Sequence, residues 1–337
     1  MTDSAFSVFI MELKNIKKAG VEVYLPIYLE AMRLDTFVDF DLFIKIGREH
    51  ILYRAADLPF NERTRSTLLD NNVTHLYILA SAKKRYQRYI ESNIKQIIND
   101  ETIPEATKAG IIYDSSKLLV RDVLDNPTLG DNIHRAKKMV ENHVDYILRG
   151  NKSFHNLLDL MSFDYYTYTH SVNVCTFSVA FAQYLGYDDE EFLNNLGTGA
   201  LLHDVGKTRI ADSILNKKAR LTPDEMNLIR KHPKWGVQII KETKIIEEAS
   251  LYPVIQHHER EDGSGYPFGS TGNDIHIYGK IVGIADSFDA MTTRRVYQDA
   301  LSTFTALKTM FSLNGAYDQK LLEKFARLMG PASMAKK

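Results

Sequence analysis

The sequence predicts an α+β N-terminal domain followed by an all-α C-terminal domain. Alternating apolar and polar residues, typical of half-buried strands, are concentrated between residues 20 and 80. After residue 81 the apolar residues recur with helical spacing. A length of 337 residues also exceeds the usual size of one domain, so two domains are expected.

Within the first part, residues 21–25 and 37–44 show the alternation expected of strands, and residues 50–53 and 75–79 are predicted to be two more short strands. Between the third and fourth of them, residues 61–70 favour a helix. The Asn61 side chain suits the start of this helix because it accepts a hydrogen bond from an N–H group of the first turn.

Three longer helices are predicted next, over residues 81–99, 105–125 and 131–149. The first is amphipathic, with one apolar stripe that contains Tyr86, Tyr89, Ile90, Ile94 and Ile97. We place a boundary near Gly150. The prediction is therefore a regulatory or sensory α+β domain over residues 1–104, a helical connector over 105–149 and an all-α domain over 150–330. Breaks in the last part are expected at Gly186, Gly206, Pro223, Pro233, Pro253 and Gly263–Gly272.

Composition narrows the class of protein. The net charge of −1 disfavours bulk nucleic acid as a partner, because proteins that bind nucleic-acid backbones usually carry excess positive charge. The single cysteine, Cys175, excludes an intrachain disulfide and a Cys-rich structural zinc site, which fits a reducing, cytoplasmic compartment. No apolar run approaches the roughly 18–20 residues of a membrane helix, so no membrane partner is expected.

Five of the eleven histidines lie in motifs with the residue types of a metal site. They are His170, His203 in His203-Asp204-Val205-Gly206-Lys207, His232 in Lys231-His232-Pro233, and the pair that opens His257-His258-Glu259-Arg260-Glu261-Asp262-Gly263-Ser264-Gly265-Tyr266-Pro267. Asp286 follows these motifs. Imidazole and carboxylate groups are the expected ligands for Fe, Mn or Zn ions that keep positions open for water and substrate.

The order and spacing of these motifs resemble the HD-GYP family, a branch of the HD superfamily of phosphohydrolases. The resemblance covers about 180 residues and includes the long His-His-Glu-Arg-x-Asp-Gly-x-Gly-Tyr-Pro signature. It implies that the C-terminal part is an HD-type helical domain. It also implies that the protein hydrolyses the bacterial second messenger cyclic di-GMP.

By this resemblance the metal ligands are His170, His203, Asp204, His232, His257, His258 and Asp286. We expect Asp204 to bridge two ions, since adjacent helical residues project about 100° apart and His203 would then bind one ion alone. Such an ion pair activates water and neutralises charge that develops on a phosphate. The resemblance therefore implies a bridging hydroxide that attacks phosphorus, with two divalent ions, Fe or Mn, as cofactors.

The resemblance also assigns the substrate contacts. Lys207 would touch the scissile phosphate and assist the leaving oxygen, because its positive charge suits the negative charge that grows there. Arg295 would hold a ligand phosphate, which a guanidinium can grip with two hydrogen bonds. Gly265 and Tyr266 of the signature loop would shape the substrate site, for which a plain tight loop is the alternative.

Two departures from the family pattern affect these expectations. Tyr166 replaces a glutamate that helps some members to hold a third metal, so we predict two metals and expect His258 to bind weakly or to lie behind the ligands. The segment Val296-Tyr297-Gln298 replaces Pro-Tyr-Arg or Pro-Tyr-Lys. The missing cation at Gln298 would weaken the hold on the second phosphate.

The predicted function is hydrolysis of cyclic di-GMP to linear pGpG, GMP or both. One alternative is a weak or inactive cyclic di-GMP sensor or protein-interaction module, and another is a phosphodiesterase for a different cyclic dinucleotide. A homodimer is expected, with the N-terminal domain as either a dimerisation module or a signal sensor. A GGDEF-type diguanylate cyclase is a candidate protein partner.

Overall fold

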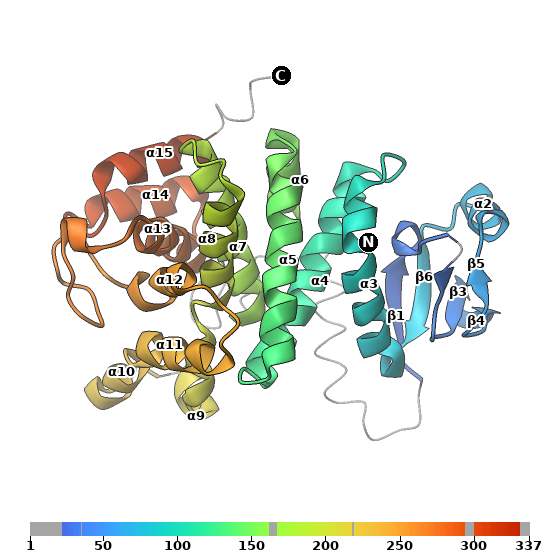
Figure 1. The fold of residues 1–337 in the computed structure, drawn as a ribbon, viewed down its shortest axis with the longest axis horizontal. Helices are drawn as coiled ribbons and strands as arrows, with labels where there is room; N and C mark the ends of the chain where they lie inside the picture. The colour runs from blue at the N-terminus through green and yellow to red at the C-terminus, as the bar shows by residue number, and fades with distance from the viewer. Residues whose placement is uncertain (1–21, 35, 162–166, 218, 294–299, 331–337) are drawn as a thin grey trace. The chain divides into compact units, whose positions relative to one another are not determined.

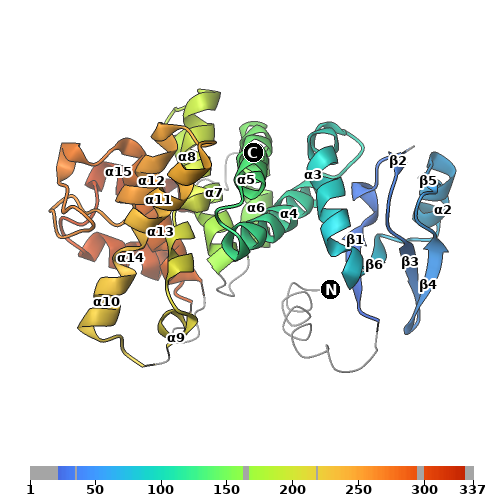
Figure 2. The same ribbon diagram turned by 60° about the horizontal axis from the view of Figure 1, so that its bottom comes forward.

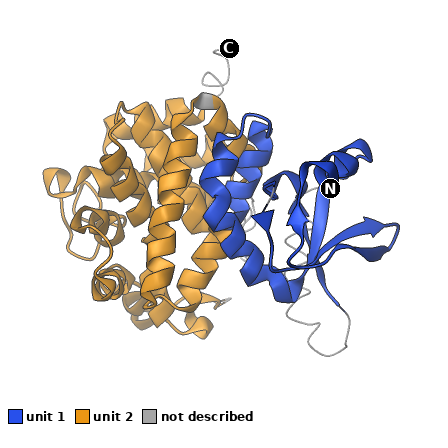
Figure 3. Cartoon of the chain, turned by 45° about the vertical axis from the view of Figure 1, so that its right-hand side comes forward, with its two compact units in different colours: residues 1–115 blue, residues 116–337 orange. Residues whose placement is uncertain are grey.

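The computed structural model describes residues 22–34, 36–161, 167–217, 219–293 and 300–330. Two compact units divide the chain, residues 1–115 and residues 116–337, as the two colours of Figure 3 show. The division falls within helix α4 (Glu105–Asp125), whose bounds agree with the predicted helix. The predicted order, a sheet-containing part followed by a helical part, is confirmed.

The first unit contains two antiparallel sheets (Figure 1). The larger has the strand order β1-β6-β3-β4, and the smaller pairs β2 with β5. The strand bounds are β1 (Tyr24–Tyr28), β2 (Thr36–Phe37), β3 (Leu42–Ile46), β4 (Glu49–Arg54), β5 (Pro59–Phe60) and β6 (His75–Leu79). Two short 3-10 turns, η1 (Leu29–Ala31) and η2 (Ala80–Ala82), follow β1 and β6.

The predicted strand over residues 37–44 is wrong, because β2 ends at Phe37 and β3 begins at Leu42. The alternation that suggested one strand is present, since Val38, Phe40 and Leu42 are all buried. Between the two strands, however, Asp41 accepts a hydrogen bond from the backbone N–H of Ala56 at 2.7 Å. Strand pairing is interrupted there while the alternate burial continues.

Helices α2 (Glu62–Asp70) and α3 (Lys83–Asn99) and the first part of α4 are the helices among the described residues of this unit. The Asn61 side chain accepts a hydrogen bond from the Thr64 N–H at 3.0 Å, so the predicted cap is confirmed. In α3 the predicted stripe is also confirmed: Ile90, Ile94 and Ile97 are buried, and two tyrosines of the same stripe pack against the core of the sheet.

The second unit is helical, and Figures 1 and 2 show its helices from two sides. Its elements are α5 (Gly130–Leu148), α6 (Asn151–Leu160), α7 (Thr167–Tyr184), α8 (Glu190–Leu202), η3 (Val205–Arg209), α9 (Asp212–Leu215), α10 (Pro223–Ile229), α11 (His232–Thr243), η4 (Glu248–Ser250), α12 (Leu251–Gln256), η5 (Gly272–Asp274), α13 (Ile277–Thr292), α14 (Thr303–Ser312) and α15 (Gln319–Met329). The predicted breaks at Pro223, Pro233 and Pro253 lie in the first turns of helices, where a missing N–H costs little.

The core of the second unit is centred on α7 and α13, which are buried along most of their length. Edge-to-face contacts join Phe177 of α7 to Phe288 of α13 and Phe288 to Phe325 of α15, with ring centroids 5.3 and 5.2 Å apart. This packing fixes α7 and α13 side by side, and each carries one of the predicted metal ligands. No helix in the described part of the chain is long and apolar enough to cross a membrane.

His143 of α5 gives the first testable prediction. Its Nε2–H donates to the Thr176 hydroxyl at 2.9 Å, because that hydroxyl donates its own proton to the Val172 carbonyl. Burial lowers the pKa of His143 to about 4, from the ordinary value of 6.5 for a histidine. As the pH falls, His143 is therefore protonated in the unfolded chain before it is protonated in the folded protein. The contribution of neutral His143 to the free energy of unfolding is complete above pH 6.5 and is lost toward pH 4.

We expect the free energy of unfolding to fall less steeply between pH 6.5 and 4 in His143→Gln than in the wild type. The difference in slope should approach, at most, about 1.4 kcal/mol per pH unit, the value for one proton. Urea unfolding followed by circular dichroism at several pH values measures both slopes. Equal slopes would show that His143 is protonated in the folded state or contributes nothing to this dependence.

Candidate metal centre

His203 and Asp204 lie at the end of a helix rather than within one. Helix α8 ends at Leu202, His203 is its C-cap, and Asp204 has φ −98° and ψ 3° before η3 begins. The expectation that the pair projects from a regular helix is therefore wrong for Asp204. The turn brings the two side chains close together, with His203 Nε2 3.4 Å from Asp204 Oδ2.

The first cluster of ligand types consists of His170, His203 and Asp204, which come from α7 and from the turn after α8. One ligand atom from each lies within 4.8 Å of the others. Asp286 of α13 joins the cluster, because its Oδ1 lies 3.1 Å from His170 Nε2 and 4.0 Å from His203 Nε2. All four residues are buried.

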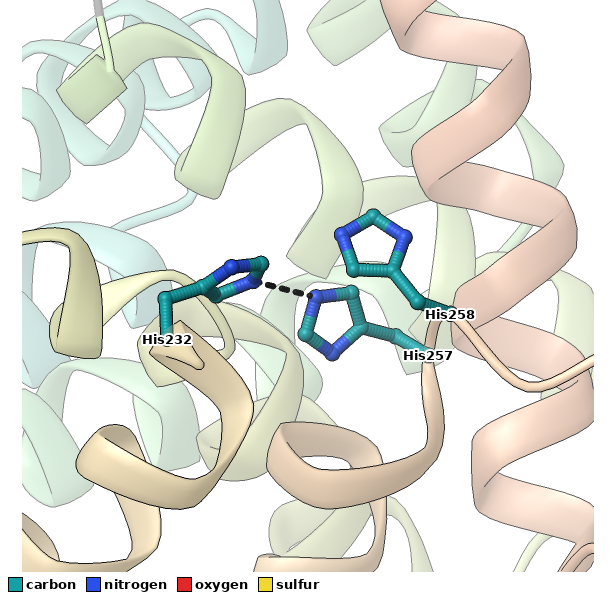
Figure 4. A group of neighbouring side chains, drawn as sticks. All are labelled: His232, His257 and His258. Carbon is teal, nitrogen blue, oxygen red and sulfur yellow. Dashed lines mark hydrogen bonds between the residues drawn. The ribbon is translucent and has the colours of Figure 1, made fainter. Parts of the chain in front are cut away.

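The second cluster consists of His232, His257 and His258, drawn in Figure 4. His232 begins α11, whereas the other two follow α12. The Nε2 atoms of His232 and His257 are 3.2 Å apart, the contact dashed in the figure. Asp286 reaches this cluster as well, since its Oδ2 lies 3.7 Å from His258 Nδ1.

Asp204 lies between the two clusters with one oxygen toward each. Its Oδ2 faces the first cluster, at 3.8 Å from His170 Nε2, and its Oδ1 is 3.3 Å from His232 Nε2 in the second. This is the placement that a carboxylate bridging two ions requires. The structure thus brings together all seven side chains that the sequence nominated as metal ligands.

The hydrogen bonds of the histidines leave ligand atoms without partners. The Nδ1–H groups of His203, His232 and His257 donate to backbone carbonyls of Ala200, Ile229 and Pro253, at 2.7, 2.8 and 2.9 Å. In neutral imidazoles their Nε2 atoms therefore present lone pairs to the centre. Two of these lone pairs face each other across 3.2 Å, an arrangement that a cation would relieve.

At the site, His203 Nε2 and Asp204 Oδ1 are buried and have no hydrogen-bond partner. Buried polar atoms usually have partners, so an orphaned nitrogen in the first cluster and an orphaned oxygen that faces the second indicate that each cluster could bind a cation. Imidazole nitrogen and carboxylate oxygen are donors that divalent Fe, Mn and Zn accept. The residues present therefore fit a metal site.

The protonation states of these groups also suit metal binding. Burial lowers the pKa of His232 to about 4 and that of His258 to about 3, and it holds the pKa of His257 well below its usual range. Burial opposes ionisation of Asp204, but the charge of Lys207 and the contacts of His203 hold its pKa well below the ordinary value. Metal ligands must be deprotonated, so His232, His257, His258 and Asp204 are in the required form near neutral pH.

Asp289 was not nominated by the sequence, although it completes the first cluster from behind. Its Oδ2 accepts the Nδ1–H of His170 at 2.7 Å, and its Oδ1 accepts from Asn173 and Thr293 at 2.8 and 3.2 Å. A carboxylate in this position fixes the tautomer and orientation of a metal-binding histidine. The available signal was its spacing, one helical turn after Asp286, which places both acids on one face of α13.

The structure describes some, but not all, of the residues that were predicted to contact the substrate. Lys207 donates to Asp204 Oδ2 at 2.6 Å, and its side chain is 21% exposed, so it borders both the clusters and solvent. Tyr266 lies over His258 with ring centroids 4.6 Å apart. Arg295, Tyr166 and the segment Val296-Tyr297-Gln298 lie outside the described residues.

Glycines allow the close packing that brings the two clusters together. A Cβ on Gly206 would lie 2.0 Å from the His232 carbonyl oxygen and 2.6 Å from the Gly236 nitrogen. A Cβ on Gly265 would meet the backbone of His258, Glu259 and Arg260 at 2.5 Å. Both contacts are with backbone atoms, which cannot rotate away.

We expect Gly206→Ala to separate η3 from α11 and so to pull Asp204 away from His232. Overpacking of this kind usually costs about 1–3 kcal/mol, and here the obstacle is backbone on both sides. The variant should bind less metal, measured by elemental analysis after dialysis, and should unfold at a lower temperature. A variant with wild-type metal content and melting temperature would contradict this packing.

Comparisons with known proteins agree with this geometry. A family model for the HD domain matches residues 152–321. The cyclic di-GMP phosphodiesterase PA4108 of Pseudomonas aeruginosa is 31% identical over 228 residues, which cover 67% of this chain and 55% of that protein. The 3′3′-cGAMP-specific phosphodiesterase 2 of Vibrio cholerae is 39% identical over 124 residues, 36% of this chain and 24% of that protein. The chain thus spans about half the length, or less, of these curated relatives.

One solved structure resembles most of the chain. Bd1817, an HDG"Y"P protein from Bdellovibrio bacteriovorus, superposes with a TM-score of 0.62 at 25% sequence identity, over 91% of this chain and 99% of that one. The resemblance to HD-GYP proteins that the motifs predicted is confirmed. The matching family model spans about half of the chain and includes all seven candidate ligands, so this chain belongs to the HD domain family.

Proposed function

We propose that this protein is a metal-dependent phosphodiesterase that hydrolyses cyclic di-GMP to linear pGpG, GMP or both. The observation that carries the proposal is the pair of clusters joined by Asp204, with Lys207 beside them. Relatives named as cyclic di-GMP phosphodiesterases support the substrate. The clusters alone support a phosphodiester substrate but do not select among cyclic dinucleotides.

Seven residues would hold two divalent ions, Fe or Mn: His170, His203, Asp204, His232, His257, His258 and Asp286. Bound there, such ions supply charge neutralisation for the phosphate and activation of water. The chain contributes neutral His232, His257 and His258, ionised Asp204 and Asp286, and the burial that keeps bulk water from competing for the ligands. We also propose that Asp204 is shared between the two ions.

Lys207 would act on the leaving group. Its ammonium group donates to Asp204 Oδ2 at 2.6 Å, and its partial exposure would let it meet a substrate phosphate that approaches from solvent. During cleavage, negative charge grows on the departing 3′ oxygen. A fixed cation that donates a hydrogen bond to this oxygen stabilises that charge more than it stabilises the ground state. Lys207 would therefore raise the rate rather than the affinity.

A turnover assay with a substrate panel tests the proposal. The protein is prepared anaerobically with Fe or Mn and incubated with cyclic di-GMP, 3′3′-cGAMP and cyclic di-AMP, and products are identified by chromatography. We expect linear pGpG or GMP from cyclic di-GMP, and no product after chelation of the metals. Two bound ions together with tight binding and no product from any substrate would overturn the enzymatic proposal and favour a sensor.

A related substrate is the second candidate. Relatives from Vibrio cholerae are named as 3′3′-cGAMP-specific phosphodiesterases, at 39%, 32% and 32% identity over parts of the chain. The ratio of kcat/KM for 3′3′-cGAMP and cyclic di-GMP in the same assay decides between the two. A ratio above 1 would make cyclic di-GMP the secondary substrate.

A further inference from the structure

Two cations and two aromatic rings lie on the two segments that carry the second histidine cluster. We call Arg230, Lys234, Tyr266 and Phe268 the cationic rim. Arg230 and Lys234 lie two residues before and two residues after His232, at the junction of α10 and α11. The two rings belong to the loop that follows His257 and His258.

The rim is connected to the metal centre by a chain of contacts. The Arg230 guanidinium carbon lies 5.6 Å from the centroid of the Tyr266 ring, and that ring packs on His258 at 4.6 Å. The Lys234 ammonium lies 5.0 Å from the centroid of the Phe268 ring. Each cation therefore lies over an aromatic face, and one of the two faces touches a candidate metal ligand.

The charges of the rim are not neutralised. Arg230 and Lys234 are both exposed, and neither forms an ion pair with a carboxylate in the described parts of the chain. Lys207, by contrast, is paired with Asp204. A guanidinium that interacts with the face of a ring still has N–H groups that can bind an anion. Phe268 is 63% exposed, which leaves a large apolar surface beside these cations.

The rim is also held in place relative to the ligands. Glu259, which is buried, accepts hydrogen bonds from the backbone N–H groups of Phe268 and Ser270 at 2.8 and 2.9 Å. The backbone N–H of Arg230 donates to carbonyls of the last turn of α10, and α11 begins two residues later at His232. These backbone contacts fix the positions from which the side chains of the rim extend.

We propose that Arg230 and Lys234 hold the second phosphate of a cyclic dinucleotide while the first lies at the metal centre, with Tyr266 and Phe268 against its bases. This inference rests on the proposed function and identifies how the same site selects a dinucleotide. The sequence had indicated a weakened hold on the second phosphate, because Gln298 replaces a family cation. The cationic rim would instead supply cations from the α10–α11 side of the site. A phosphodiester without a second phosphate would not use the rim.

Steady-state kinetics with two substrates test this role. Arg230→Ala/Lys234→Ala is compared with the wild type on cyclic di-GMP and on bis(4-nitrophenyl) phosphate, which has one phosphate and no nucleobase. Lys241→Ala, which removes an exposed cation of the same helix, is the control. For cyclic di-GMP we expect KM to rise at least about tenfold, with kcat within about threefold of wild type, since a charged hydrogen bond is lost in both ground and transition states. We expect no change with bis(4-nitrophenyl) phosphate or in the control.

The outcomes separate the two proposals. An unchanged KM for cyclic di-GMP, or an equal loss of kcat on both substrates, would overturn the role of the rim and leave the proposed function intact. If the wild type cleaves the small substrate but no cyclic dinucleotide, the proposed function fails. The rim is then judged by fluorescence anisotropy of labelled cyclic di-GMP: weaker binding to the double variant supports it, and equal or absent binding overturns it.

Discussion

Replacing Asp204 with alanine is expected to abolish both metal binding and phosphodiesterase activity. Asp204 has one oxygen near each cluster, at 3.8 Å from His170 and 3.3 Å from His232, and it lies deeper than Asp286, whose two oxygens also face the two clusters. Loss of groups that merely orient metal ligands already costs about 10–100-fold in metal affinity or activity. Loss of the shared ligand itself should therefore lower kcat/KM for cyclic di-GMP by more than about 100-fold.

The Asp204→Ala protein would be assayed for bound metal by elemental analysis and for product by chromatography. Asp188→Ala, which removes an exposed acid between α7 and α8, is the matched control and should behave as wild type. Circular dichroism establishes that the variant is folded. Hydrolysis of cyclic di-GMP at the wild-type rate by Asp204→Ala would contradict the proposed mechanism at its centre.

Replacing Asp289 is expected to have the next largest effect, although this residue contacts no candidate ion site directly. It holds His170 through a 2.7 Å hydrogen bond to Nδ1, which leaves Nε2 for the centre. In Asp289→Asn the side chain keeps its size and can still accept from Asn173. An amide nitrogen turned toward His170 would instead favour the opposite tautomer, with the proton on Nε2.

We expect Asp289→Asn to lower metal affinity about 10–100-fold while the protein remains folded. Competition with a chromophoric chelator measures the affinity, and this readout does not depend on turnover. Asp289→Ala should add a loss of stability of about 1–3 kcal/mol, because buried donors of His170, Asn173 and Thr293 lose their acceptor. Equal metal affinity in Asp289→Asn and wild type would show that Asp289 has only a structural role.

Most local features were predictable because their causes are local. The cap at Asn61, the stripe of α3 and the bounds of α4 depend on residues within one or two turns. The strand over residues 37–44 was predicted wrongly for the converse reason. Its alternation was correct, but pairing depends on which strand lies alongside, and a contact between Asp41 and Ala56 interrupts it.

The candidate site shows the same division. His203, Asp204, Lys207 and the paired histidines belong to motifs whose residue types and order are visible in the chain. Asp289 lies only three residues beyond a nominated ligand, but its role depends on α13 packing beside α7. The cationic rim likewise depends on where the loop after His258 folds against the junction of α10 and α11.

The sequence by itself determined the order of the two parts, the family of the second and the seven candidate ligands, because local periodicity and motif spacing carry that information. The tertiary structure decided how the candidate ligands divide between two clusters, that Asp204 lies between them, that Asp289 contacts His170, and that Tyr266 of the rim contacts Arg230 and His258. The physical reason is that these relations are distances between helices. They are set by close backbone contacts such as that of Gly206 with His232, which join residues far apart in the chain.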